Sequence, residues 1–154
     1  MNFPLFIDLK DKKVLIVGAG AIAARRATVL VEFGARVTVM GPEAGSGIQE
    51  LAQAGSIVWR QHIFRAQDLE ELAQSFLVIA ATSDPAVNDH IVQLCHERHI
   101  PVNHAGDQTQ CDFQFPAIVQ KGPVVLGVNA NGKDHGLVRR VAAGLREWIA
   151  REKF

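Results

Sequence analysis

Two glycines and an alanine near the start of the chain have the spacing of a phosphate-binding turn. Gly18, Gly20 and Ala23 form G-x-G-x-x-A in the stretch KVLIVGAGAIAARRA, between an apolar run and a helical pattern. Gly18 allows a tight turn, Gly20 lets the backbone approach a pyrophosphate, and Ala23 lets a helix pack on a strand. The first N–H groups of that helix, at Ala21 and Ile22, are suited to an anion. The motif predicts a dinucleotide site; a glycine-rich turn without a ligand is the alternative.

The end of the next apolar run bears on which dinucleotide is bound. A typical NAD site has an acidic residue there, which binds the ribose hydroxyls. Met40 and Gly41 occupy that place, and Glu43 follows just beyond them. Glu43 either reaches the ribose or is a solvated loop residue. No Arg or Lys lies between residues 39 and 48 to meet the 2′-phosphate of NADP. Arg25 and Arg26 of the preceding helix could do so, but such residues are more often surface charges, so we expect NAD.

Small and hydroxyl side chains follow a later apolar run. Ala81, Thr82 and Ser83 come directly after FLVIA. In a doubly wound sheet the carboxyl ends of the strands face the ligand crevice, so small residues there let a cofactor pass and the hydroxyls can bind ribose or phosphate. The same segment can cap a helix, because Ser83 or Asp84 before a proline is favourable N-cap chemistry. The two roles are compatible.

Apolar strands alternate with helical patterns over most of the chain. The pattern predicts strands at 13–18, 35–40, 56–61, 76–82 and 100–105. It predicts helices between them at 21–34, 48–55, 66–75 and 84–99. We therefore predict an α/β fold with a Rossmann-like, doubly wound parallel sheet that is covered on both faces.

The pattern changes after about Gly106. The stretch 111–132 predicts two strands without a helix between them, and a final helix follows. Its apolar stripe, which is typical of packing and also suits a dimer interface, comprises Leu137, Val138, Val141, Ala142, Leu145, Trp148 and Ile149. We predict a nucleotide-binding domain at 1–110 and a substrate-facing strand-helix dimerisation segment at 111–154.

Composition narrows the class of protein. The 154 residues suit one domain with a small appendage, and 48% hydrophobic residues can bury a core. A formal net charge of zero does not indicate a basic surface for nucleic acid. The start lacks the charge order of a secretory signal, and no apolar run is long enough for a bilayer. We expect a cytoplasmic protein in which Cys95 and Cys111 form no disulfide framework.

Four blocks of the chain, in their order, resemble one enzyme family. They are PLFIDLKDKKVLIVGAGAIAARRA, GARVTVMGPE, VIAATSDPAVN and CDFQFPAIVQKGPVVLGV. Together they resemble precorrin-2 dehydrogenase, the nicotinamide-binding module of siroheme synthase. The resemblance implies a Rossmann domain with a dimerisation segment, a homodimer, and NAD⁺-dependent oxidation of precorrin-2 to sirohydrochlorin. It also implies that some members take Fe²⁺ as a further substrate and insert it to make siroheme.

The resemblance places a catalytic carboxylate after the fifth strand. The family often has V-N-x-x-D-D there, and this chain has VNHAGD, residues 102–107. Gly106 thus replaces the first carboxylate, and Asp107 remains. Oxidation of the reduced macrocycle removes a hydride and a proton, so a base is needed. We expect Asp107 to be that base, with His104 as the substitute; an ordinary turn at Asp107 is the alternative.

Two other classes of function stay open at this point. One is a nucleotide-sensing regulatory module, like the Rossmann domains that gate potassium transport. Such modules usually keep the acidic ribose-binding residue that Met40 and Gly41 replace here. The other is a tetrapyrrole-binding chelatase or carrier without dehydrogenase activity, which Gly106 motivates. The fold by itself does not choose among them.

Overall fold

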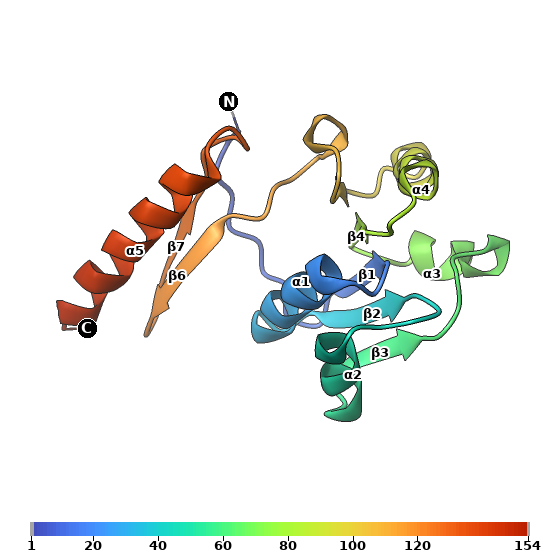
Figure 1. Cartoon of the computed structure of the whole chain (residues 1–154), viewed down its shortest axis with the longest axis horizontal. Helices are drawn as coiled ribbons and strands as arrows, with labels where there is room; N and C mark the ends of the chain where they lie inside the picture. The colour runs from blue at the N-terminus through green and yellow to red at the C-terminus, as the bar shows by residue number, and fades with distance from the viewer. Residues whose placement is uncertain (1, 154) are drawn as a thin grey trace. The chain divides into compact units, whose positions relative to one another are not determined.

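The computed structural model describes residues 2–153, which form two compact units (Figure 1). The larger unit comprises residues 7–113. The smaller unit combines residues 114–153 with residues 2–6 of the N-terminal segment. A hydrogen bond of 3.1 Å from the backbone N–H of Asn2 to the Asn131 side chain ties the two parts of the smaller unit together. The domain boundary predicted at residue 110 stays a prediction.

The larger unit is built on a five-stranded parallel sheet. In sheet order the strands are β3 (Ile57–Arg60), β2 (Arg36–Met40), β1 (Lys13–Val17), β4 (Leu77–Ala80) and β5 (Val102–His104). The chain builds outward from β1 to β3 and then returns to the other side of β1 with β4. The gap between β1 and β4 is therefore the topological switch point, where sheets of this kind bind ligands. The predicted Rossmann-like sheet is confirmed.

Helices cover both faces of this sheet. They are α1 (Ala21–Glu32), α2 (Ser46–Gln53), α3 (Leu69–Ala73) and α4 (Pro85–Glu97), with 3-10 turns η1 (Ala66–Asp68) and η2 (Gln108–Gln110). Leu15 of β1 packs in one cluster with Leu72 of α3 and Ile91 of α4. Ile16 is equally buried and points to the opposite face, since strand side chains alternate. This two-sided burial explains why the strands are almost wholly apolar.

Several predicted elements are shorter than expected, and in two of them a side chain accepts backbone N–H groups at or near the end of the element. The helix predicted at 66–75 is a 3-10 turn followed by one short α-helix, and Asp68 at their junction accepts the N–H of Arg65 at 2.8 Å. Strand β5 ends at His104, whose ring accepts the N–H groups of Gly106 and Asp107 and so turns the chain. The carboxyl end of β5 is thereby converted into a loop.

The smaller unit is a hairpin packed on a helix. Strands β6 (Ala117–Lys121) and β7 (Val124–Val128) are antiparallel, and α5 (His135–Arg151) follows. Ala142 and Ile149 of α5 are buried with Val119 of the hairpin. The Lys121 ammonium donates to the carbonyls of Ile149 and Ala150 and so caps the end of the helix. Within residues 2–153, no helix has the length and apolarity that a bilayer span requires.

Candidate functional site

Gly18 joins the carboxyl ends of three strands. Its N–H donates to the Met40 carbonyl at the end of β2 (2.7 Å), and the Ala81 N–H donates to the Val17 carbonyl of β1 (2.7 Å). The φ angle of Gly18 is +109°, and a Cβ there would lie 2.2 Å from the Ala81 carbonyl oxygen. Glycine is therefore required by both backbone conformation and close approach. This contact holds the turn after β1 against the end of β4, at the switch point.

Gly20 has a different role from Gly18. It is the N-cap of α1. Among residues 2–153 no side chain caps this helix end, and a Cβ on Gly20 would meet no atom within 4 Å. Ala24 is the first residue of the helix to donate to a carbonyl, that of Gly20, so the N–H groups of Ala21, Ile22 and Ala23 have no acceptor within the helix. Open space before unpaired donors and a positive helix end fits a pyrophosphate.

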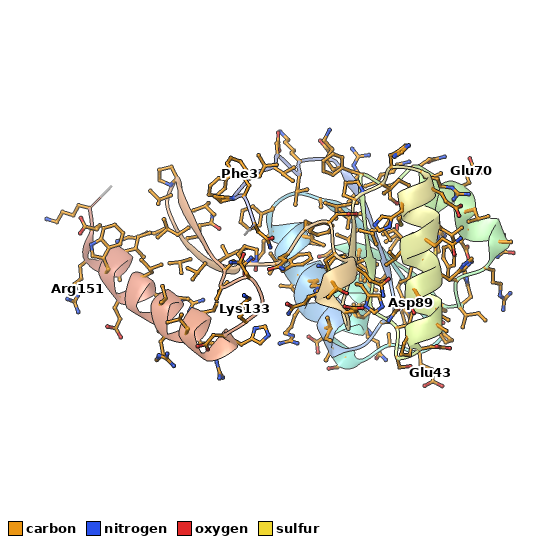
Figure 2. All side chains as sticks on the ribbon, turned by 90° about the horizontal axis from the view of Figure 1, so that it is seen from above. Phe3, Glu43, Glu70, Asp89, Lys133 and Arg151 are labelled. Atoms are coloured by element: carbon orange, nitrogen blue, oxygen red, sulfur yellow. The ribbon has the colours of Figure 1, made fainter. Side chains whose placement is uncertain are left out.

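The loop that carries Glu43 lies against this turn. The N–H of Gly45 donates to the Ala19 carbonyl (3.2 Å), and a Cβ on Gly41 would lie 2.8 Å from that of Ala19. Trp59 of β3 supports the loop from the other side, since its indole N–H donates to the Gly41 carbonyl at 3.0 Å. Glu43 itself is exposed and directed outward (Figure 2). The ribose contact of Glu43 stays a prediction.

The segment after β4 is organised by Asn88 of α4. Its side-chain oxygen accepts the N–H of Thr82 (3.0 Å) and the Thr82 hydroxyl (2.8 Å). Asp84 supplies the N-cap of α4, since its carboxylate accepts the Ala86 N–H at 2.9 Å. Of the two predicted capping residues the structure thus uses Asp84, and Ser83 stays exposed beside the pocket described next.

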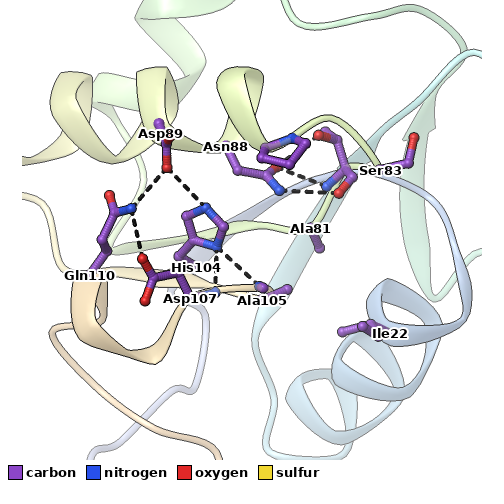
Figure 3. A pocket seen from close by; sticks show the side chains of 12 residues that line it. Ile22, Ala81, Ser83, Asn88, Asp89, His104, Ala105, Asp107 and Gln110 are labelled. Carbon is purple, nitrogen blue, oxygen red and sulfur yellow. Dashed lines mark hydrogen bonds and ion pairs between the residues drawn. The ribbon is translucent and has the colours of Figure 1, made fainter.

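A pocket of about 380 Å³ opens at the carboxyl ends of β4 and β5 (Figure 3). It brings together six residues that the sequence predicted: Ile22, Ala81, Thr82, Ser83, His104 and Asp107. The other five predicted residues, Gly18, Gly20, Ala21, Ala23 and Glu43, do not line it. Its lining also includes three polar side chains that were not predicted as site residues: Asn88, Asp89 and Gln110. Two of them could have been predicted from the sequence. Asn88 and Asp89 lie three and four residues after Pro85, so they share the helix face at the start of this predicted helix.

The imidazole of His104 is buried in the wall of the pocket. Its Nδ1 accepts the N–H groups of Gly106 (3.0 Å) and Asp107 (2.9 Å). Since both partners are donors, Nδ1 has no hydrogen, and the neutral ring carries its proton on Nε2. That Nε2 lies 3.3 Å from the Asp89 Oδ1 atom, although the geometry does not make a hydrogen bond. The ring thus joins the loop after β5 to the start of α4.

The carboxylate of Asp107 accepts hydrogen bonds from residues of its own loop. Its Oδ1 accepts the N–H (2.9 Å) and the hydroxyl (2.7 Å) of Thr109, and its Oδ2 accepts from the Gln110 amide (3.1 Å). The side-chain hydrogen bond from Thr109, with further ones from Gln110 and the Thr109 backbone, lowers the pKa of Asp107 to about 2. The carboxylate is therefore charged across the whole physiological range.

The loop after β5 is supported by residues outside the pocket. Asn103 receives a hydrogen bond from the Arg26 guanidinium of α1 and donates to the Phe113 carbonyl at 2.7 Å. Cys111 accepts the His104 N–H at 3.2 Å, and burial raises the pKa of its thiol, which stays protonated. Arg26 thus faces β5, so it does not lie at the end of β2 where a 2′-phosphate would be bound.

Known proteins are similar in sequence to most of this chain. A model of the family described as "Putative NAD(P)-binding" matches residues 5–117. The siroheme synthase of Photorhabdus laumondii is 40% identical over 138 residues, which are 90% of this chain and 29% of that protein. The siroheme synthase of Hydrogenovibrio crunogenus is 36% identical over 146 residues, which are 95% of this chain and 31% of that protein. The chain thus spans less than a third of the length of these curated relatives.

A solved structure of this kind is also similar over nearly the whole chain. The structure titled SirC, precorrin-2 dehydrogenase, has a TM-score of 0.79 and 28% sequence identity, and the match covers 95% of this chain and 70% of that one. Its fold agrees with the five-stranded sheet and the strand pair that follows it. Because the family model covers well over half of the residues, the chain belongs to this NAD(P)-binding family.

Proposed function

We propose that the chain catalyses the NAD⁺-dependent oxidation of precorrin-2 to sirohydrochlorin during siroheme synthesis. One observation carries this proposal: the uncapped N-terminus of α1 and the polar pocket after β4 and β5 lie at the same switch point, where the backbone of Gly18 lies close to Ala81. A dinucleotide bound there reaches from the first feature to the second. The names of the siroheme synthase and precorrin-2 dehydrogenase relatives support the choice of substrate.

The cofactor would be held mainly by the backbone. In this proposal the N–H groups of Ala21 and Ile22 bind the pyrophosphate, and Glu43 binds the ribose hydroxyls. We propose NAD rather than NADP because Glu43 would repel a 2′-phosphate and no Arg or Lys lies between residues 39 and 48. When bound, NAD⁺ supplies the hydride acceptor. Ala81 leaves room for the ring, and Ser83 offers an exposed hydroxyl at the pocket rim.

The same pocket supplies groups for the proton that is lost with the hydride. His104, Asp107 and Asp89 line it together. The sequence favours Asp107 as the base, and the structure adds Asp89 of α4 as a second carboxylate, which accepts from the same Gln110 amide as Asp107. Both carboxylates belong to the pocket that would receive the macrocycle edge, so a proton acceptor for the reaction is available there.

A second copy of the chain is the proposed partner of α5. The predicted apolar stripe divides in the structure: Ala142 and Ile149 are buried against the hairpin, whereas Leu137, Val141 and Trp148 are 43%, 41% and 51% exposed. The exposed three follow one side of the helix. Covering this side in a homodimer would remove apolar surface from water.

Two further expectations belong to this proposal. Fe²⁺ insertion into sirohydrochlorin is what the family resemblance implies, and a cytoplasmic location is an expectation from the sequence pattern. Fe²⁺ would enter as a substrate. Among the described residues, no group of three or more His, Cys, Asp or Glu side chains gathers as a metal site.

The test is direct. Purified protein is mixed with freshly made precorrin-2 and NAD⁺, and the absorbance of NADH and of sirohydrochlorin is followed together. We expect both to rise in equal amounts, and NADP⁺ to be a poorer acceptor. A separate arm with sirohydrochlorin and Fe²⁺, without NAD⁺, tests metal insertion. If neither NADH nor sirohydrochlorin forms while NAD⁺ binds, the regulatory-module alternative is favoured.

A further inference from the structure

We propose that Asp89 of α4 is the proton acceptor of the reaction and that His104 is the positioning residue that orients its carboxylate. The inference rests on the proposed function, because it names the group that carries out one of its steps. The observation behind it is the meeting of Asp89, His104 and Gln110 in the pocket, where a buried imidazole nitrogen faces an accessible carboxylate (Figure 3).

The hydrogen bonds of His104 exclude it as the proton acceptor. Nδ1 already accepts two backbone N–H groups, from Gly106 and Asp107. Nε2 carries the hydrogen of the neutral ring, so it has no lone pair for a further proton. If Nδ1 were protonated, its N–H would point at the backbone N–H groups of Gly106 and Asp107, and both hydrogen bonds would be lost. His104 is therefore a donor toward the pocket.

The hydrogen bonds of Asp107 make it a weak base. Both of its carboxylate oxygens accept hydrogen bonds, two from Thr109 and one from Gln110. A proton taken up by Asp107 would have to displace at least one of these donors. Hydrogen bonds to the charged form disfavour the protonated form, and the pKa of Asp107 is lowered to about 2. Asp107 is better described as the residue that shapes the loop after β5.

Asp89 has the features that the other two groups lack. Its side chain is 55% exposed and lies at the pocket. Oδ1 accepts the Gln110 amide at 2.9 Å and lies 3.3 Å from His104 Nε2. Oδ2 has no hydrogen-bond partner among residues 2–153. One oxygen is thus anchored while the other is open to substrate.

The buried nitrogen of His104 is a second, independent observation. The side chain of His104 is 4% exposed. Its Nε2 is the one buried side-chain nitrogen or oxygen of the described residues that has no hydrogen-bond partner. An unpaired buried donor is costly, so such a group needs a role. Asp89 Oδ1 is the acceptor within reach, and a small rotation of its carboxylate would complete the bond.

The oxidation removes two hydrogens from the macrocycle, one as a hydride and one as a proton. Oxidation breaks a C–H bond of the reduced macrocycle, and its electron pair leaves with the hydrogen as hydride to the oxidised nicotinamide. A second ring hydrogen leaves as a proton, and its bonding electrons form the new double bond of the product. Asp89 Oδ2 binds that proton and becomes a carboxylic acid. After product release the acid loses the proton to water.

Asp89→Asn is the central variant for the test. The amide keeps an oxygen that can accept from Gln110 and His104, but it cannot bind the proton. We expect the rate of precorrin-2 oxidation to fall by about 10²–10⁴-fold, with NAD⁺ affinity by calorimetry unchanged. Asp89→Glu should recover part of the rate. Glu97→Gln, which makes the same carboxylate-to-amide change at the other end of α4, is the matched control and should keep the full rate.

Comparing the oxidation rates of Asp89→Asn and Asp107→Asn shows which of the two carboxylates accepts the proton. We expect Asp107→Asn to lose less than tenfold, because the role of Asp107 is in the loop. If Asp107→Asn loses about 10²–10⁴-fold while Asp89→Asn keeps the parent rate, the proposal is overturned and Asp107 is the base. If the unsubstituted chain binds NAD⁺ but does not oxidise precorrin-2, the proposed function fails and this inference fails with it.

A readout without cofactor or substrate tests the role of His104. Nitrogen NMR of the histidine rings distinguishes the two neutral tautomers. We expect His104 to be the Nε2–H tautomer in the free protein, and its Nε2 signal to move in Asp89→Asn but not in Glu97→Gln. A hydrogen on Nδ1, or an unchanged Nε2 signal in Asp89→Asn, would contradict the proposed pairing.

Discussion

The backbone N–H of Asp107 donates to Nδ1 of His104 at 2.9 Å, so the pocket loop is built on a neutral imidazole. The same loop then folds Asp107 onto Thr109. His104 and Asp107, the two candidate bases predicted from the sequence, are therefore parts of one turn. This arrangement and the glycine turn before α1 lead to three testable predictions, and the exposed stripe of α5 leads to a fourth.

The low pKa of Asp107 depends on Thr109. Because the folded pKa is about 2, below the ordinary value of about 3.9, the stabilising effect of the charged carboxylate is complete above about pH 4. It is lost as the pH falls through about 2. Thr109→Ala should raise the pKa of Asp107 toward its ordinary value. Carbon NMR titration of the Asp107 carboxyl group measures this, and an unchanged midpoint in Thr109→Ala would show that the hydroxyl is not the main cause.

Gly20→Asp should affect binding without affecting folding. A Cβ there would meet no atom of the described residues within 4 Å, but the charge of the aspartate would lie in the space before the α1 N–H groups. We expect NAD⁺ affinity to fall by more than tenfold, which is about 1.4 kcal/mol or more. Calorimetric titration gives the affinity, and circular dichroism checks the fold. Unchanged affinity would remove the pyrophosphate site from the start of α1.

Gly18→Ala should have the opposite outcome. The added Cβ would lie 2.2 Å from the Ala81 carbonyl oxygen, at a φ of +109°. Backbone strain and overpacking each cost about 1–3 kcal/mol, so we expect a loss of about 3 kcal/mol or more in the free energy of unfolding. Urea denaturation measures it, with Gly55→Ala as the control: Gly55 also has a positive φ, +70°, but its Cβ would meet nothing within 4 Å. Equal losses in both variants would mean that close approach at Gly18 contributes nothing.

The exposed stripe of α5 can be tested apart from its buried side. Val141→Glu with Trp148→Glu should convert the proposed dimer into monomers by light scattering, while NAD⁺ affinity is kept. Ala143→Glu, an exposed position away from the stripe, is the control. Leu145 is a poorer probe, because it packs against the hairpin cluster, and a charge there would destabilise the unit itself. A monomeric parent protein at micromolar concentration would reject the dimer.

The sequence by itself determined the local elements of the fold: the apolar strands, the helices between them and the glycine turn. Apolar runs of strand length, separated by amphipathic helices, specify a two-sided parallel sheet, because each strand must be covered on both faces. The glycine spacing before Ala21 specifies a turn that only glycine can form at Gly18. These signals are carried by neighbours in the chain. The structure therefore has the predicted strands and the predicted turn at nearly the predicted residues.

Only the tertiary structure decided which side chains meet. Asp89 comes from α4 and His104 from β5, and they come together only because β4 and β5 are neighbours with α4 crossing between them. The tautomer of His104 depends on how the loop after β5 turns back onto the ring. The division of the α5 stripe depends on the angle at which the hairpin packs. Such contacts follow from the packing of elements far apart in the chain, and residue type and spacing do not encode that geometry.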